Sequence, residues 1–263
     1  MPALPTAVTA ALPREFEDLL TPAGRRVLAG QDTAICQALA DPRRRFIALN
    51  GMVAPRKAEA MRNVLEAALL PHLRRMEAPI PSETIWEMQT DYEEWLPKTA
   101  RVMTAYLENR RSKAMTVARE IGIIDLLTSE SFVAFAEQVA GRKLDRKGGQ
   151  QVLCYGPGDY AGPHNDHHPE NIRAAKGYLD IHLSLANRFV QHQYLVYAKG
   201  GHFTEIVPVH SLGGLTIYRL PFWHYTTPLT ALPGKEAQAR RWLLLGTFLF
   251  ADTKNKKKSA MRA

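Results

Sequence analysis

Apolar residues in the first half of the chain recur every three or four positions, the spacing that places them on one face of a helix. This pattern predicts a helix over residues 54–76 and a second helical stretch over about 97–127, with Gly122 as its break point. A third helix is predicted over 129–140. We therefore expect residues 1–149 to form a mainly helical part that packs on the rest of the chain.

From residue 150 onward the pattern changes to short runs rich in β-branched and aromatic residues, separated by Gly and Pro. The runs cover residues 151–155, 178–186, 193–198, 202–209, 214–220 and 240–250. Closely spaced short strands without helices between them are typical of an antiparallel sandwich or barrel. The two halves together predict an α+β fold in which the N-terminal helices cover one face of the sheet.

The formal net charge of +8 does not by itself indicate a nucleic-acid partner. Five of the positive charges lie in the last ten residues, and the basic segment 253–263 is polar and aperiodic, so we expect a disordered tail. We see neither a secretory leader nor an apolar run of the roughly 18 residues that span a bilayer. Two cysteines, Cys36 and Cys154, are too few for a disulfide framework. These features predict a cytoplasmic protein with no membrane partner.

Histidines concentrate in the strand-rich half, which makes that half the place to look for metal chemistry. There His164-Asn165-Asp166 follows a Gly- and Pro-rich turn at the end of a predicted strand. In an extended strand, residues two apart point to the same side, so His164 and Asp166 can reach one ion. Joined by a histidine from a distant strand, they would form the two-histidine, one-carboxylate site that binds Fe(II) and leaves its other face open.

The order of motifs from Gln150 to Phe250 resembles the 2-oxoglutarate oxygenases of the prolyl-hydroxylase type. The residues that carry the resemblance are Tyr155, Gly158, Tyr160, His164 and Asp166, followed by Gly200-Gly201, the strand Gly213 to Tyr218, His224 to Leu229 and Arg241 to Leu245. The resemblance implies a double-stranded β-helix, the jelly-roll or cupin-like barrel, over residues 150–252. It also implies Fe(II), 2-oxoglutarate as co-substrate and O2.

The resemblance implies that His224 is the third metal ligand, and that Arg241 binds the distal carboxylate of 2-oxoglutarate. A guanidinium suits that role because it presents a rigid pair of donors. The gap between these two residues is longer than is usual in the family, with the excess at 231–237, so Arg240 stays an alternative. Strand alternation lets only one of the two arginines point inward.

Other polar residues of the strand-rich half have less certain roles. The resemblance implies that Tyr155 donates a hydrogen bond to the co-substrate carboxylate. His182 either faces the barrel interior and hydrogen-bonds the co-substrate or is a plain core histidine. His202 and His210 compete with His224 for the position of distal ligand. The remaining candidates are His167 and His168, which either line the site or belong to a solvated loop, and the acidic, aromatic stretch 86–95, which either covers the barrel mouth or packs.

The function implied is a dioxygenase that hydroxylates a C–H bond of a small molecule, such as an amino acid or a natural-product intermediate, and releases succinate and CO2. One alternative is a hydroxylase of peptide or protein side chains, and another is a cupin-like metalloenzyme that does not use 2-oxoglutarate. A nucleic-acid demethylase is disfavoured because the strand after His224 lacks the second arginine and the asparagine of such enzymes.

Overall fold

The computed structural model describes residues 12–80, 99–145, 148–166, 174 and 177–251. Its α-helices are α1 (Pro22–Leu28), α2 (Pro55–Val64), α3 (Lys113–Glu120), α4 (Ile123–Thr128) and α5 (Glu130–Ala140). Short 3-10 segments lie at Phe16–Leu19 and Leu70–His72, and a π-helical turn at Leu65–Leu69 extends α2. The strands are β1 (Phe46–Leu49), β2 (Arg74–Pro79), β3 (Thr99–Tyr106), β4 (Leu144–Asp145), β5 (Gln150–Tyr155), β6 (Tyr160–His164), β7 (Tyr178–Ala186), β8 (Val190–His192), β9 (Tyr194–Lys199), β10 (His202–Pro208), β11 (Leu212–Leu220), β12 (His224–Thr226), β13 (Thr230–Ala231) and β14 (Arg241–Phe250).

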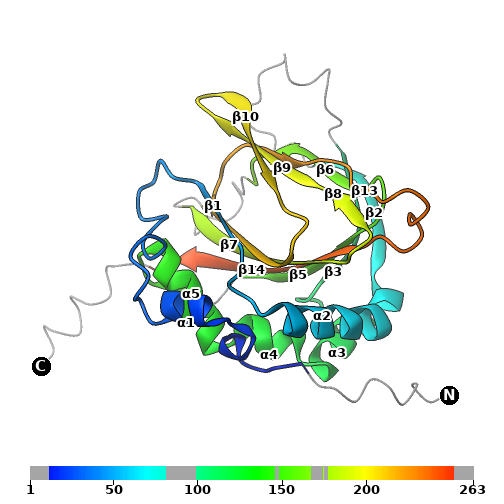
Figure 1. Cartoon of the computed structure of the whole chain (residues 1–263), viewed down its shortest axis with the longest axis horizontal. Helices are drawn as coiled ribbons and strands as arrows, with labels where there is room; N and C mark the ends of the chain where they lie inside the picture. The colour runs from blue at the N-terminus through cyan, green and yellow to red at the C-terminus, as the bar shows by residue number, and fades with distance from the viewer. Residues whose placement is uncertain (1–11, 81–98, 146–147, 167–173, 175–176, 252–263) are drawn as a thin grey trace, which may run out of the picture.

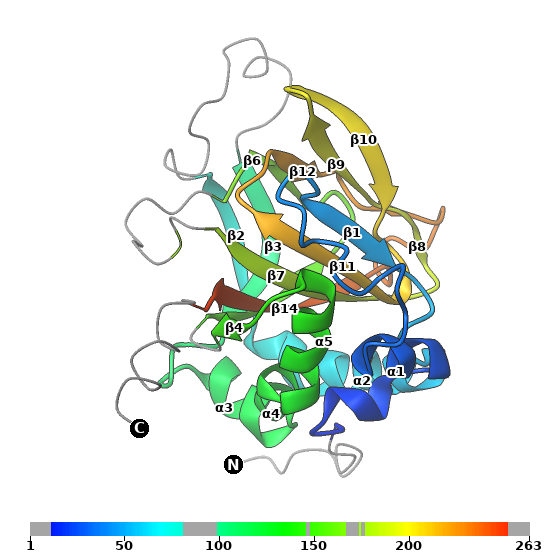
Figure 2. The same ribbon diagram turned by 90° about the vertical axis from the view of Figure 1, so that its left-hand side faces the viewer.

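Twelve of the described strands form one antiparallel sheet in the order β1-β11-β7-β14-β5-β3-β6-β12-β9-β10, with β2 on β3 and β4 on β14. Strand β3 pairs with both β5 and β6, so it joins a larger layer to a smaller one. The two layers curl toward each other into a nearly closed barrel (Figures 1 and 2). This is the double-stranded β-helix, and the predicted antiparallel barrel is confirmed.

The helices pack on the outer face of the larger layer (Figure 2), and strand β7 shows why the sequence permits this. All nine of its residues are buried, but they alternate between two environments. Leu179, Ile181, Leu183 and Leu185 pack in the same core as the helices. The alternate residues Tyr178, Asp180 and His182 line a cavity inside the barrel. Because successive side chains of a strand point to opposite faces, one strand serves both the core and the site.

The predicted strands after residue 150 are all present, whereas the helix predictions before it were partly wrong. The helix predicted over 54–76 ends earlier, and strand β2 begins at Arg74. The first part of the stretch predicted over 97–127 is strand β3, and helices α3 and α4 follow it. The break at Gly122 is confirmed, with φ at +88°. Strand β3 carries the β-branched residues Thr99, Val102 and Thr104, and pairing on both edges decides its conformation.

Four strands that precede residue 150, β1 to β4, belong to the main sheet, so residues 1–149 contribute to the barrel as well as to the helical layer. The division of the chain at residue 150 stays a prediction. No helix within the described ranges is both long and apolar enough to cross a membrane. The tail 253–263, the stretch 86–95 and the pair His167 and His168 lie outside the described residues.

Candidate metal centre

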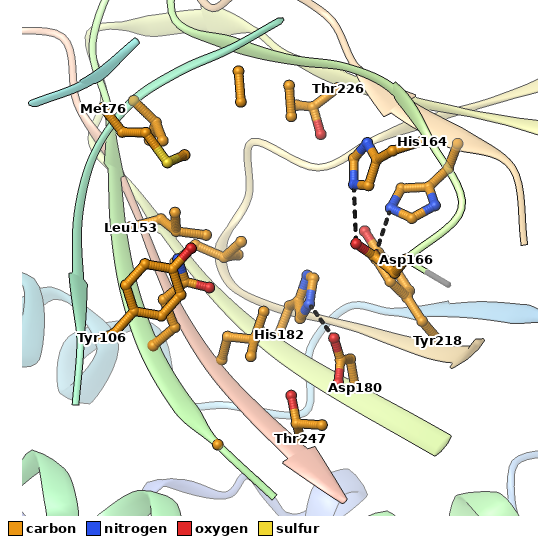
Figure 3. Close-up of a pocket in the computed structure, with 18 of the residues that line it drawn as sticks. Met76, Tyr106, Leu153, His164, Asp166, Asp180, His182, Tyr218, Thr226 and Thr247 are labelled. Carbon is orange, nitrogen blue, oxygen red and sulfur yellow. Dashed lines mark ion pairs between the residues drawn. The ribbon is translucent and has the colours of Figure 1, made fainter. Parts of the chain in front are cut away.

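The three predicted metal ligands come together at one edge of the barrel interior. His164 ends β6 and His224 begins β12, and these strands pair with His164 directly opposite His224. The imidazole Nε2 atoms of both histidines lie 3.5 Å from carboxylate oxygens of Asp166 (Figure 3). One ligand atom from each residue lies within 4.8 Å of the others. Strand pairing therefore explains how residues 60 positions apart can share one ion.

Asp166 reaches the cluster by a different route from the one predicted. We expected strand alternation to align it with His164, but β6 ends at His164 and Asp166 has a left-handed backbone with φ at +53°. Asp tolerates this conformation better than most residues do. The hydroxyl of Tyr178 donates a hydrogen bond of 2.6 Å to the backbone oxygen of Asp166. A tight turn anchored by Tyr178 directs the carboxylate toward the histidines.

Backbone carbonyls fix the protonation of both imidazoles. Nδ1 of His164 lies 2.6 Å from the oxygen of Gly162, and Nδ1 of His224 lies 2.9 Å from that of Phe222. A carbonyl can only accept, so each Nδ1 carries the proton and each Nε2 keeps its lone pair facing the cluster. This is the outer hydrogen bond that metal-bound histidines usually make. Two imidazole nitrogens and a carboxylate oxygen fit Fe(II) as a facial donor set.

Burial, together with the neighbouring His164, lowers the pKa of His224 to about 3. His224 is therefore neutral at pH 7 and available to a cation. In the unfolded chain its pKa returns to an ordinary value near 6.5. Below that pH the unfolded state takes up a proton that the folded state refuses, so acid favours unfolding.

We expect the metal-free protein to lose about 2 kcal/mol of unfolding free energy from His224 between pH 7 and pH 5. Urea unfolding of the metal-free protein at the two pH values measures this loss. The variant His224→Gln should show a smaller loss over the same interval because it has no group to titrate. An equal loss in both proteins would contradict the buried, neutral state of His224.

The three candidate ligands line a cavity of about 930 Å³ that is also lined by Arg241. Only 3% of Arg241 is exposed. Its Nε donates to Oγ of Ser184 at 2.9 Å and its Nη1 to Oε1 of Gln193 at 3.0 Å. The guanidinium lies 5.4 Å from the ring centroid of Tyr155. Burial lowers the pKa of Arg241, yet an arginine stays charged in proteins.

No carboxylate forms an ion pair with Arg241 among the residues that the structure describes. A buried charge is unfavourable unless it meets an opposite charge. Neighbouring Arg240 instead points away from this cavity and donates to the backbone oxygen of Ala237 at 2.8 Å. The arginine that faces the interior is thus Arg241, and its role as carboxylate anchor stays a prediction.

The competing histidines lie outside the cluster. His202 is exposed on β10. Nδ1 of His210 lies within hydrogen-bonding distance of the backbone of Gln193, 3.2 Å from its nitrogen and 3.1 Å from its oxygen. Neither residue belongs to the group of three potential ligands found in the described chain. His224 is the histidine that the structure brings to His164 and Asp166.

Tyr155 and His182 both line the cavity, as expected. Burial raises the pKa of Tyr155, so its hydroxyl stays protonated and can donate. The His182 ring lies 4.4 Å from that of Tyr218, measured between centroids. Their contacts with a co-substrate stay predictions.

Ser184 and Gln193, which hold Arg241, were missed in the sequence. Ser184 donates its own proton to the oxygen of Val209 at 2.8 Å. The side-chain Nε2 of Gln193 donates to two backbone oxygens. Its Oε1 is therefore turned toward the guanidinium of Arg241. A signal for Ser184 was present: Asp180, His182 and Ser184 alternate with leucine and isoleucine in one strand. Such alternation indicates a polar cavity on one face.

Asp159 stabilises the turn that leads into β6 and the metal ligands. Its carboxylate is 3% exposed and binds Arg75 of β2 through two oxygens, at 2.7 and 2.9 Å. It also accepts from the backbone nitrogen of Gly156 at 2.8 Å. The side chain therefore connects β2 to the turn between β5 and β6.

We expect Asp159→Asn to lower the unfolding free energy by about 2–3 kcal/mol, because it removes a buried carboxylate that pairs with the more exposed Arg75 and accepts from the backbone of Gly156. Chemical denaturation measures the change. The matched control is Asp41→Asn, which breaks a similar two-oxygen pair with Arg43 at the exposed surface and should leave stability nearly unchanged. Equal effects in the two variants would contradict the role given to burial.

Comparison with known proteins relates the fold to one group of enzymes. No protein-family model matches the sequence, and no curated protein matches it. Prolyl 4-hydroxylase from Phytophthora capsici is similar in structure over 96% of this chain and 71% of its own, with a TM-score of 0.54 and 13% identity. A 2OG-Fe(II) oxygenase family oxidoreductase from Burkholderia pseudomallei is similar over 92% and 96%, with a TM-score of 0.51 and 12% identity.

A third similar structure is the non-heme α-ketoglutarate-dependent carbocyclase SnoK from nogalamycin biosynthesis. It is similar over 85% of this chain and 89% of its own, with a TM-score of 0.50 and 12% identity. The chain thus has the double-stranded β-helix fold of the 2-oxoglutarate- and Fe(II)-dependent oxygenases. At these identities the comparisons establish the fold alone, and the function rests on the site.

Proposed function

We propose that this protein is an Fe(II)- and 2-oxoglutarate-dependent oxygenase that hydroxylates a C–H bond of a small molecule. The observation that carries the proposal is that one cavity holds both a cluster of three possible metal ligands and a buried arginine that meets no carboxylate among the described residues. A metal site alone is common to many cupin-like proteins. Arg241 adds a place for the second carboxylate of a dicarboxylate co-substrate.

In this proposal His164, Asp166 and His224 hold Fe(II), and Arg241 binds the distal carboxylate of 2-oxoglutarate. When bound, the iron and co-substrate supply the oxidising chemistry, in which substrate, 2-oxoglutarate and O2 give hydroxylated substrate, succinate and CO2. Ser184 and Gln193 position the guanidinium through the hydrogen bonds described above. Tyr155 supports it from the ring side and can donate its own hydroxyl to the same carboxylate.

The remaining cavity wall is mostly apolar, with Met76, Ile80, Val102, Leu153 and Leu245 among its residues. Such a wall excludes water and binds the carbon skeleton of a substrate. A volume of about 930 Å³ is in the range of pockets for small ligands, which supports a small molecule as substrate. A peptide side chain is the alternative, in line with the prolyl hydroxylase among the similar structures.

The experiment is to supply the protein with Fe(II), O2 and 2-oxoglutarate and to measure succinate with a panel of amino acids, peptides and small natural-product-like compounds. We expect succinate to form only when 2-oxoglutarate is present and to increase with a true substrate. A cupin-like enzyme of another kind would turn over its substrate without 2-oxoglutarate. Absence of any 2-oxoglutarate binding would contradict the proposal.

A further inference from the structure

One part of the cavity wall carries three polar side chains, of which only His182 has been predicted to contact the co-substrate. Asp180 and His182 point inward from β7, and Thr247 points inward from β14, where it is the direct strand partner of Asp180. Figure 3 shows the three side chains near one another on the wall, apart from His164. Asp180 is 7% exposed and His182 is 8% exposed.

Two atoms of this group have no hydrogen-bond partner among the residues that the structure describes. They are Oδ1 of Asp180 and Nε2 of His182, both of which are buried. The other carboxylate oxygen of Asp180 lies 3.9 Å from Nε2 of His182, which is longer than a hydrogen bond. A buried carboxylate oxygen without a hydrogen-bond donor is unfavourable. Oδ1 of Asp180 is therefore suited to accept a hydrogen bond from a ligand.

The charges on the cavity wall indicate whether the ligand that donates to Asp180 is neutral or cationic. Within the described chain the acidic side chains on its wall are Glu108, Asp166 and Asp180, and Arg241 is the only arginine or lysine there. Under the proposed function Fe(II) and Arg241 carry three positive charges, which Asp166 and the 2-oxoglutarate dianion balance. Asp180 then has no arginine or lysine beside it on the described wall. Burial raises the pKa of its carboxyl, so a ligand that brings a positive charge is favoured because it stabilises the carboxylate.

This group also lies away from the site proposed for the co-substrate. Ser184, which binds Arg241, is four residues from Asp180 along β7, a separation of roughly 13 Å in an extended strand. Tyr218 lies between this group and the candidate metal ligands: its ring centroid is 4.4 Å from that of His182 and 5.3 Å from that of His224. A second ligand can therefore bind at Asp180 while 2-oxoglutarate occupies the Arg241 end.

We infer that Asp180, assisted by Thr247, binds the ammonium group of the substrate, so that the substrate class is an amine with an apolar or aromatic body. The inference rests on the proposed function, because the charge balance assumes iron and 2-oxoglutarate. The ammonium donates to the unpaired oxygen of Asp180 and supplies the missing positive charge. The apolar body lies against the wall formed by residues such as Val102, Leu153 and Leu245.

The test compares 2-phenylethylamine with its neutral counterpart 2-phenylethanol by calorimetric titration. Both are titrated into the full chain, once with Mn(II) and 2-oxoglutarate bound and once with neither. We expect the amine to bind the loaded protein at least about tenfold more tightly than the alcohol, because a charge-assisted hydrogen bond in a buried site favours the cation. Asp180→Asn, which keeps the side-chain volume, should abolish that preference.

The matched control is Asp125→Asn, which removes one negative charge from the exposed surface of α4 and should keep the preference. Equal affinity for amine and alcohol in the wild type, or a preference that survives in Asp180→Asn, would overturn the inference. Should that variant fail to fold, the wild-type comparison decides alone. If Mn(II) and 2-oxoglutarate do not bind but the amine preference depends on Asp180, the proposed function is wrong and the amine site stands.

Discussion

His224→Ala should lower the affinity of the protein for Fe(II) or Mn(II) by more than about 100-fold and abolish succinate formation, while the chain stays folded. The expectation follows from the pairing of β6 with β12, which places His164 directly opposite His224. Nδ1 of each ring faces a backbone carbonyl, so Nε2 of each has a free lone pair for the metal. Removing either imidazole leaves two protein ligands in place of the three that a facial site needs. His164→Ala and Asp166→Ala should have similar effects.

Metal affinity is measured by calorimetry or by the relaxation of water protons in the presence of Mn(II), and thermal melting checks the fold. His202→Ala and His210→Ala are the controls, because both histidines were competing candidates and both lie outside the ligand cluster. An active His224→Ala variant together with an inactive control variant would move the distal ligand to the other histidine.

Arg241→Ala should raise the half-saturating concentration of 2-oxoglutarate by roughly 30- to 1000-fold, with a much smaller change in iron affinity. This range corresponds to about 2–4 kcal/mol, the usual loss when one partner of a buried, charge-assisted pair is removed. The side chain is held by Ser184 and Gln193 before any ligand arrives, so little ordering is needed on binding.

The measurement is a titration of 2-oxoglutarate under saturating Fe(II), supported by direct binding in the absence of O2. Arg240→Ala is the matched control, since it removes a neighbouring guanidinium that points to the other side of the strand. A normal curve for Arg241→Ala and a weakened one for Arg240→Ala would exchange their roles. Two normal curves would contradict the use of 2-oxoglutarate.

The strands of the barrel could be predicted because their apolar residues alternate over whole segments, as in β7 and β14, where one face meets the helices and the other the cavity. Strand β3 could not be predicted, because the apolar residues of TARVMTAY also fit the spacing of a helix. Only its pairing with β5 and β6 makes it a strand. Local pattern carries no information on which edges of a sheet are open.

The sequence indicated which three residues would come together but not their geometry, and their binding of a metal stays a prediction. The motif order indicated His164, Asp166 and His224, whereas the left-handed turn at Asp166 depends on Tyr178, twelve residues away. Gln193 was missed for a related reason. A single glutamine in a strand-rich segment gives no periodic signal, and its partners come from four separate places in the chain.

The buried charge of Arg241, which meets no carboxylate among the described residues, bears on how this position evolves. A buried charge without a counter-charge lowers the stability of the ligand-free protein. An apolar side chain of similar size at this position would remove that unfavourable contribution. Under the proposed function, selection for binding a dicarboxylate keeps the arginine in place. In a lineage that no longer needed the reaction, selection would not oppose replacement of Arg241 by an apolar side chain of similar size.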